Sequence, residues 1–194
     1  HRFSIAIVGD SQEDALQVAK DIVAYDSRGC MAPVVVFCIG KANHLAIQLH
    51  KMLKELEMSN PLGTSDPYLG PEIRRRIGLA VQSQDSVHLE RTLNKTWGVI
   101  QLPPKHCTWT ALPRLVSVVG VSSPEEFANL LIDWQDTLST IGCGPTVDRD
   151  IWIPTLHSKP RICNVGAMQF PPFTRLHDGI PMWPDVLKNN SSFE

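Results

Sequence analysis

The sequence lacks the features that mark several classes of protein. It contains no apolar run near the roughly 18 residues that a membrane-spanning helix needs, and no signal-peptide pattern. Its net charge is only −2, without a basic stripe, so we expect no nucleic-acid partner. It also contains no Gly-x-Gly-x-x-Gly loop, the usual fingerprint of a dinucleotide site. We therefore expect a protein without a membrane span that does not hold a dinucleotide by itself.

Cysteine and histidine occur at spacings that argue against disulfides and metals. The five cysteines are irregularly placed, and an odd number fits neither a disulfide framework nor a zinc site. His44 and His50 are six residues apart, which does not bring them to one face of a helix. We therefore expect no metal site and a reducing, cytoplasmic setting.

What the sequence does contain is a regular alternation of strand and helix patterns. With 194 residues, 43% of them hydrophobic and 20% charged, it is long enough for one soluble domain. The alternation predicts an α/β fold: a single three-layer domain over 1–194, with a mainly parallel sheet and helices on both faces. The tail after 171 is rich in proline and is expected to be mostly loop, with a short helix at 184–188. The predicted strands cover 3–9, 34–39, 97–102, 114–120, 137–142 and 161–165, and the predicted helices cover 12–26, 43–58, 71–84 and a segment that begins at 124.

Helix ends can be read from the residue types. Ser11 with Asp14, and Ser123 with Glu126, have the three-residue spacing of a capping box and predict two helix starts. Gly29 is expected to end the first helix, because glycine accepts the left-handed backbone that often follows a last turn. The next residue, a cysteine, then stands in a short connection between that helix and a buried strand.

Cys30 in this connection is the candidate nucleophile. A cysteine nucleophile needs access to substrate, a lowered pKa and nearby donors for an oxyanion, and such a turn can provide them. Arg28 could lower the thiol pKa through its charge, or it could be a solvated cation at the end of the helix. The alternative for Cys30 is a buried structural thiol.

Three segments carry a resemblance to a known family. They are Asp26-Ser27-Arg28-Gly29-Cys30, then the run from Arg161-Ile162-Cys163-Asn164 through Met168-Gln169-Phe170-Pro171-Pro172, and His177-Asp178-Gly179-Ile180-Pro181. The run from Ser4 to Phe37 resembles the aldehyde dehydrogenase superfamily around its nucleophile, and the three segments keep the family's order. The downstream half is similar to one branch, the long-chain acyl-CoA (acyl-thioester) reductases that include the fatty-acid reductase of bacterial bioluminescence. The resemblance runs through nearly the whole chain.

The resemblance implies an activity and a domain arrangement. It implies that Cys30 attacks an acyl-CoA or acyl-protein thioester, that coenzyme A leaves, and that the acyl-enzyme accepts a hydride from NADPH to give a fatty aldehyde. The chain would be the C-terminal catalytic domain. The NADP(H)-binding domain would lie upstream, as a partner that this chain lacks, and the protein is expected to be a homo-oligomer.

Further site residues follow from the resemblance. Arg114 stands in a strand where these reductases tend to carry an arginine, and it is either a cofactor contact or a structural ion-pair residue. The superfamily's ribose-orienting glutamate is missing, since its place falls at about Thr110. The residues expected to contact substrate are Gly29, Met168, Gln169 and His177. The alternative for Met168 and Gln169 is a packing role, and the alternative for His177 is a role in a turn. Arg74-Arg75-Arg76 could hold a phosphate, although a solvated helix face fits better.

Two other functions stay open. An NAD(P)-dependent aldehyde dehydrogenase would share the nucleophile, but the missing glutamate and the Met-Gln-x-Pro-Pro tail argue against it. A non-catalytic interaction domain could keep the fold without the activity. An acyl adduct on Cys30 would distinguish the reductase from that domain.

Overall fold

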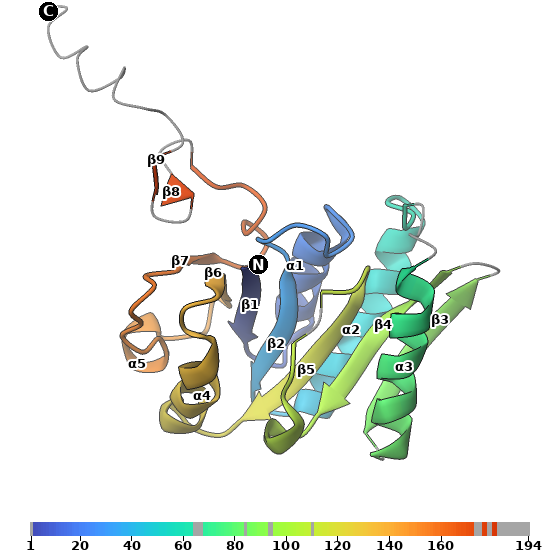
Figure 1. The fold of residues 1–194 in the computed structure, drawn as a ribbon, viewed down its shortest axis with the longest axis horizontal. Helices are drawn as coiled ribbons and strands as arrows, with labels where there is room; N and C mark the ends of the chain where they lie inside the picture. Colours follow the sequence, from blue (N-terminus) through green and yellow to red (C-terminus); the bar gives the residue numbers. More distant parts are fainter. Residues whose placement is uncertain are drawn as a thin grey trace, which may run out of the picture.

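A seven-stranded sheet is the centre of the molecule (Figure 1). The computed structural model describes residues 2–63, 68–83, 85–92, 95–109 and 111–172, together with the backbone of two short strands, β8 (Leu176–His177) and β9 (Ile180–Pro181). The strands of the large sheet are β1 (Phe3–Val8), β2 (Pro33–Ile39), β3 (Ser86–Thr92), β4 (Lys95–Leu102), β5 (Leu115–Val121), β6 (Leu138–Cys143) and β7 (Arg161–Asn164).

The sheet is parallel except at one edge. Its strand order is β3-β4-β5-β2-β1-β6-β7, and only the β3–β4 pair is antiparallel among these neighbours. The central strands β1, β2 and β5 are almost continuously buried, as their runs of Val and Ile require when helices cover both faces. The predicted fold class is thus confirmed.

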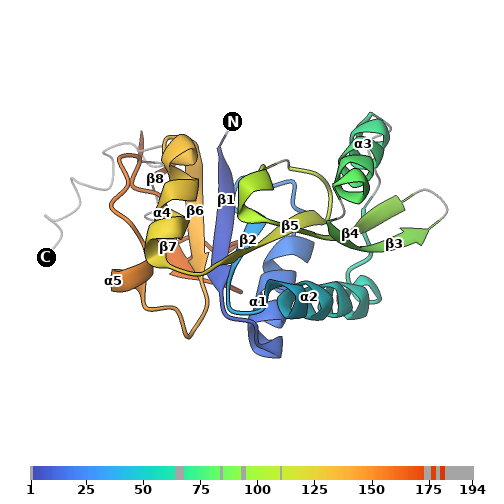
Figure 2. The same cartoon turned by 90° about the horizontal axis from the view of Figure 1, so that it is seen from below.

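Helices cover both faces of the sheet (Figure 2). α1 (Gln12–Val23) and α2 (Ala42–Glu57) pack on one face, and α3 (Leu69–Gln82) and α4 (Pro124–Leu131) on the other. Alternate strand residues point to opposite faces, so Phe37 joins the core under α4 while Val36 joins the core under α1 and α2. No helix in the described part of the chain is long and apolar enough to cross a membrane.

The serine of each predicted capping box caps its helix. Ser11 Oγ accepts a hydrogen bond from Asp14 N at 3.1 Å, and Ser123 Oγ accepts one from Glu126 N at 3.1 Å. The Glu126 carboxylate reaches back to Ser122 N at 2.7 Å, one residue earlier than in the usual box. These local signals therefore predicted two helix starts correctly.

The end of the first helix differs from the prediction. α1 ends at Val23 and not near Gly29. The left-handed residues that follow it are Asp26 and Ser27, with φ of 54° and 57°, and Ser27 N donates a hydrogen bond to Ile22 O at 3.0 Å. This bond is the six-to-one contact of a Schellman helix end, so the chain turns three residues earlier than the glycine suggests.

Several elements, β3 and some shorter ones, were absent from the prediction. β3 alternates apolar and polar residues along the sheet edge, and the small α5 (Arg149–Trp152) and the β8–β9 pair are too short to leave a periodic pattern. The helix expected at 184–188 lies outside the described residues.

Candidate functional site

Cys30 lies in the connection from α1 to β2, at the edge of the sheet where the parallel strands begin. The side chain is half-buried. Arg28 N donates to Tyr25 O at 2.9 Å, and Ala32 N donates to Gly29 O at 3.0 Å, so the connection consists of two consecutive turns. Ser4 Oγ, on β1, donates to Cys30 O at 2.6 Å. The backbone of Cys30 is therefore tied directly to a central strand.

The other thiols are less suited to nucleophilic chemistry. Burial raises the pKa of Cys38 and of Cys107 to about 12, and that of Cys143 to about 11. The nearby carboxylates of Asp10 and Asp14 raise the pKa of Cys38 further. A thiol with such a pKa carries almost no thiolate at neutral pH. Cys30 and Cys163 are the two half-buried cysteines outside this group.

Gln169 lies beside the Cys30 turn. Its amide Oε1 is 3.8 Å from the position that a Cβ atom would take at Gly29. The Gln169 side chain is only 5% exposed, and its Nε2 donates to Asp21 O at 3.0 Å. Among the described residues its Oε1 has no hydrogen-bond partner. Two residues predicted to contact substrate, Gly29 and Gln169, are thus neighbours.

The segment that carries Gln169 is held from two sides. On one side, the Asp21 carboxylate of α1 accepts hydrogen bonds from Gly166 N at 2.5 Å and Met168 N at 3.0 Å. On the other, the Arg161 guanidinium donates to Met168 O at 2.8 Å and to Ala167 O at 3.0 Å. Opposite charges thus fix both the N–H and the C=O groups of this segment.

The Asp21 carboxylate that accepts these hydrogen bonds is buried. Burial raises its pKa from 3.8 to about 6, although the hydrogen bonds from the segment and the charge of Arg161 act in the opposite direction. The carboxylate is therefore ionised at neutral pH, where it can accept both hydrogen bonds.

Met168 lies in the hydrophobic core, whereas the adjacent Gln169 lies beside the Cys30 turn. Met168 is fully buried in the core beneath α1. Its thioether occupies the space that glycine leaves at Gly142, so a Cβ atom there would collide with it. The structure thus shows packing contacts for Met168, and its predicted contact with substrate stays a prediction.

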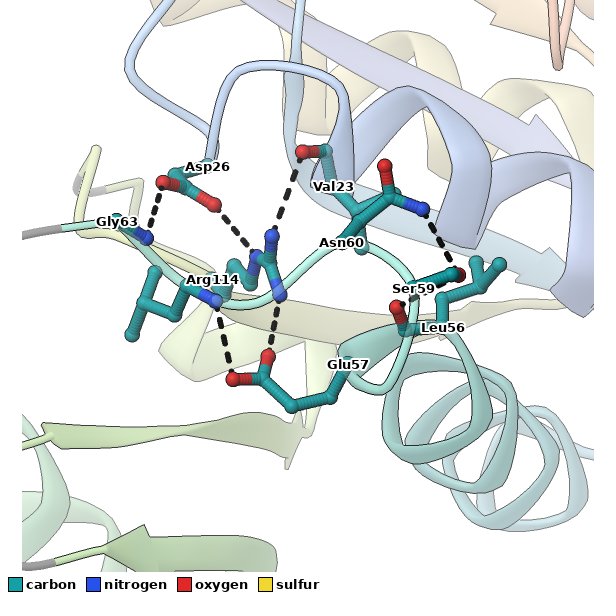
Figure 3. Close-up of polar contacts among 9 residues, drawn as sticks. Val23, Asp26, Leu56, Glu57, Ser59, Asn60, Gly63 and Arg114 are labelled. Atoms are coloured by element: carbon teal, nitrogen blue, oxygen red, sulfur yellow. Dashed lines mark hydrogen bonds and ion pairs between the residues drawn. The ribbon is translucent and has the colours of Figure 1, made fainter.

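Arg114, just before β5, is buried and ion-paired (Figure 3). Its guanidinium lies 2.7 Å from Asp26 Oδ1 and 2.5 Å from Glu57 Oε2. These are the contacts expected of a structural ion-pair residue. Its predicted contact with the cofactor stays a prediction.

The structure describes only some of the remaining predicted residues. The side chains of His177 and Thr110 lie outside the described residues. Arg75 pairs with Glu72 at 2.5 Å on the exposed face of α3, as expected of a solvated helix face. In the same helix, Arg76 is half-buried and donates to Thr108 O at 3.2 Å. Within the described ranges no group of three His, Cys, Asp or Glu residues could hold a metal.

An open cavity lies at the opposite edge of the sheet. It has a volume of about 500 Å³ and is lined by residues that follow β4 and β5, including Lys105 and Asn129. Ligands of open parallel sheets usually bind at this carboxyl edge. The Cys30 turn, in contrast, precedes β2, so the cavity is not the place where Cys30 would meet a substrate.

Three residues of the site were not predicted individually. Ser4 and Asp21 contact segments 26 and 147 residues away in the chain, and no local spacing signals such contacts. Arg161 belongs to the motif segment, but the pattern gave it no role.

A model of one protein family matches nearly the whole chain. The family is described as acyl-CoA reductase (LuxC), and the match covers residues 1–187. No curated protein matches the chain.

Solved structures with the same fold are aldehyde dehydrogenases. One, described as a methylmalonate-semialdehyde dehydrogenase of Sinorhizobium meliloti 1021 complexed with NAD, aligns with a TM-score of 0.65 at 17% identity, over 89% of this chain and 40% of its own. An NAD-dependent aldehyde dehydrogenase of Burkholderia multivorans aligns at 0.57 and 14% identity, over 86% of this chain and 36% of its own. Lactaldehyde dehydrogenase of Escherichia coli aligns at 0.59 and 14% identity, over 91% of this chain and 41% of its own. The chain spans well under half the length of these structures.

Proposed function

The chain belongs to the acyl-CoA reductase (LuxC) family, and from that premise we propose that it is the catalytic domain of an NADPH-dependent long-chain acyl-CoA reductase whose nucleophile is Cys30. The substrate would be an acyl-CoA or an acyl-protein thioester, and the product a fatty aldehyde. The observation that carries the assignment is the placement of Cys30. It is half-buried in a turn tied to β1, whereas burial keeps three of the other four thiols protonated.

The chemistry needs one residue to act twice. The Cys30 thiolate attacks the thioester carbonyl carbon, a bond from that carbon to the Cys30 sulfur forms, and the bond to the coenzyme A sulfur breaks. The coenzyme A thiolate takes up a proton as it leaves. The acyl group on Cys30 would be reduced by hydride, which is the chemistry that a nicotinamide cofactor would supply when bound. The carbon–sulfur bond to Cys30 then breaks, which releases the aldehyde and restores the thiolate.

The cofactor would be held mainly by another domain. The chain has no glycine-rich phosphate loop, and the buried charge of Arg114 is already paired with two carboxylates. NADPH as the choice over NADH, a cytoplasmic location and a homo-oligomeric assembly belong to the same proposal.

Exposed apolar side chains in the segments around Cys30 and Gln169 support a partner domain at this edge. Tyr25 is 60% exposed in the turn before Cys30, and Phe170 is 75% exposed beside Gln169. Large apolar side chains exposed in these two segments are what a surface covered by another domain would present.

The test is the mass of the intact protein after it is mixed with a long-chain acyl-CoA in the absence of cofactor. An adduct of the acyl mass that maps to Cys30 is expected in the wild type and not in Cys30→Ala. Adding NADPH or NADH in parallel samples should discharge the adduct as aldehyde, faster with NADPH. A folded protein that forms no adduct would favour a non-catalytic interaction domain. Oxidation of aldehydes as the faster reaction would favour an aldehyde dehydrogenase.

A further inference from the structure

Three residues with left-handed backbone meet next to the Cys30 turn. Asp26 and Ser27 have φ of 54° and 57°, and Arg114 has φ of 46°. None of them is glycine, and side-chain-bearing residues rarely adopt this conformation because it costs about 1–3 kcal/mol each. Such strain persists only where the surroundings impose it, and it gathers at functional sites.

Arg114 contacts both the side chain and the backbone of Asp26. Its Nε lies 2.7 Å from Asp26 Oδ1, in an ion pair that is close but not aligned as a hydrogen bond. Its backbone N–H donates to Asp26 O at 3.3 Å, and its guanidinium donates to Val23 O at 3.5 Å. One residue therefore holds both the side chain and the backbone of Asp26, together with the last residue of α1.

The segment after α2 closes the cluster from the other side (Figure 3). Glu57 pairs with Arg114 and also accepts a hydrogen bond from Leu62 N at 3.0 Å. Asp26 Oδ2 accepts one from Gly63 N at 3.0 Å. Each carboxylate is thus shared between the guanidinium and a backbone N–H group.

The contacts leave Arg114 little capacity for a ligand. The residue is 1% exposed, and a buried guanidinium is tolerated only with paired charges and hydrogen bonds around it. Binding a phosphate would require breaking these pairs in a buried site. The geometry therefore favours a role through Asp26 and against a direct contact with a cofactor.

Only three residues separate Asp26 from Cys30. Arg114 fixes the beginning of this stretch, and Ser4 Oγ fixes Cys30 O at its end. We propose that Arg114 is a positioning residue: its ion pair with Asp26 holds the strained turn in the conformation that presents the Cys30 thiol. This inference rests on the proposed function, in which Cys30 is the nucleophile.

Arg114→Met and Asp26→Asn in the full-length protein test the inference. Asn tolerates the left-handed conformation, so the second change removes the charge and keeps the local backbone preference. We expect the rate of Cys30 acylation by acyl-CoA to fall about 10- to 100-fold, because small displacements of a reacting group have effects of this size. The loss should appear in kcat, with KM for acyl-CoA changed by less than about threefold. Arg114→Lys should recover only part of the rate, because lysine cannot reach both carboxylates and Val23 O at once.

Controls separate positioning from stability. Lys54→Met breaks an exposed ion pair with Glu90 elsewhere on α2 and should leave the acylation rate unchanged. If Arg114→Met fails to fold, the neutral triple variant Arg114→Met/Asp26→Asn/Glu57→Gln replaces it, since neutralising a whole buried ion-pair cluster often restores stability. A folded triple variant or Asp26→Asn that acylates within twofold of the wild type would overturn the proposal.

The same variants distinguish failure of this inference from failure of the proposed function. Iodoacetamide alkylation of Cys30, followed by peptide mapping, reports on presentation of the thiol without any substrate. If the wild type forms no acyl adduct, the proposed function fails, and the alkylation rates still decide the positioning role. If the wild type forms the adduct and all folded variants match it in both reactions, only the positioning role fails.

Discussion

Gln169 faces Gly29 so closely that its amide Oε1 lies 3.8 Å from where a Cβ atom of residue 29 would be. This distance is an ordinary van der Waals contact, so alanine fits at position 29 and larger side chains would press on the amide. The relationship joins the turn of the nucleophile to a segment that follows it by about 140 residues in the sequence. The site is therefore expected to accept a small side chain at position 29 and not a large one.

Gly29→Ala should keep the acylation rate within about threefold of the wild type, whereas Gly29→Leu should lower it at least tenfold by displacing Gln169. Single-turnover acylation of the two folded variants checks this. Equal rates for Ala and Leu would show that Gln169 does not influence the reaction.

Cys30→Ala should lower the rate of aldehyde formation by several orders of magnitude, because no other residue of the site can replace the covalent nucleophile. The fold should persist, since the side chain is half-buried at the edge of the sheet. The measurement is turnover together with circular dichroism. More than a tenth of wild-type turnover would rule out Cys30 as the nucleophile.

Cys30 should be the most reactive thiol at neutral pH. Burial raises the pKa values of Cys38, Cys107 and Cys143 to about 12, 12 and 11, so their thiolate fractions are negligible. Limiting iodoacetamide and peptide mapping should find label first at Cys30, with Cys163 as the informative comparison. Preferential label on Cys38, Cys107 or Cys143 would contradict the structure.

Asp21 should make the folded state less stable as the pH rises from 4 to 6. Its pKa is 3.8 when unfolded and about 6 when folded, so the folded state binds the proton more tightly in this window. The stabilisation is complete below pH 3.8, is lost as the pH passes 6, and amounts to about 2–3 kcal/mol. Asp21→Asn should flatten the dependence of Tm on pH in this range. Glu13→Gln, on the exposed side of the same helix, should leave the dependence as it is.

Ser27→Gly should stabilise the protein by about 1 kcal/mol. Glycine removes the penalty of the left-handed φ of 57°, and it removes a buried hydroxyl that has no partner among the described residues. The entropy of glycine in the unfolded chain offsets part of the gain. Ala24→Gly, at a residue with φ of −55°, is the control and should lower Tm instead. A lower Tm for Ser27→Gly would mean that the hydroxyl or the strain stabilises the turn.

The layers of the fold could be predicted from sequence because they depend on local periodicity. The runs of Val and Ile that form β2 and β5, and the Ser–x–x–acid boxes, are visible within a few residues. The end of α1 could not be predicted in the same way. Asp26 takes the left-handed position expected of glycine. Its ion pair with Arg114, which is far away in the sequence, offsets the free-energy cost of this conformation.

The site shows the same division between local and distant signals. The Gly-Cys turn and the segment with Gln169 could be picked out by motif, and the structure places them side by side. The Asp21 and Arg161 contacts that hold the segment depend on tertiary packing, so no spacing of residues in the sequence predicts them. For Arg114 both interpretations were open, because an arginine before a strand looks the same whether it binds a ligand or a carboxylate.

The open cavity at the carboxyl edge offers a practical opportunity. β2 has seven residues, so the Cys30 turn and the cavity are separated by about 20 Å of strand. A dye or a surface anchor attached through Lys105 in that cavity would sit far from the thiol. Immobilised or fluorescent protein prepared in this way would present the Cys30 edge to solution, which suits it to observing acyl transfer on single molecules.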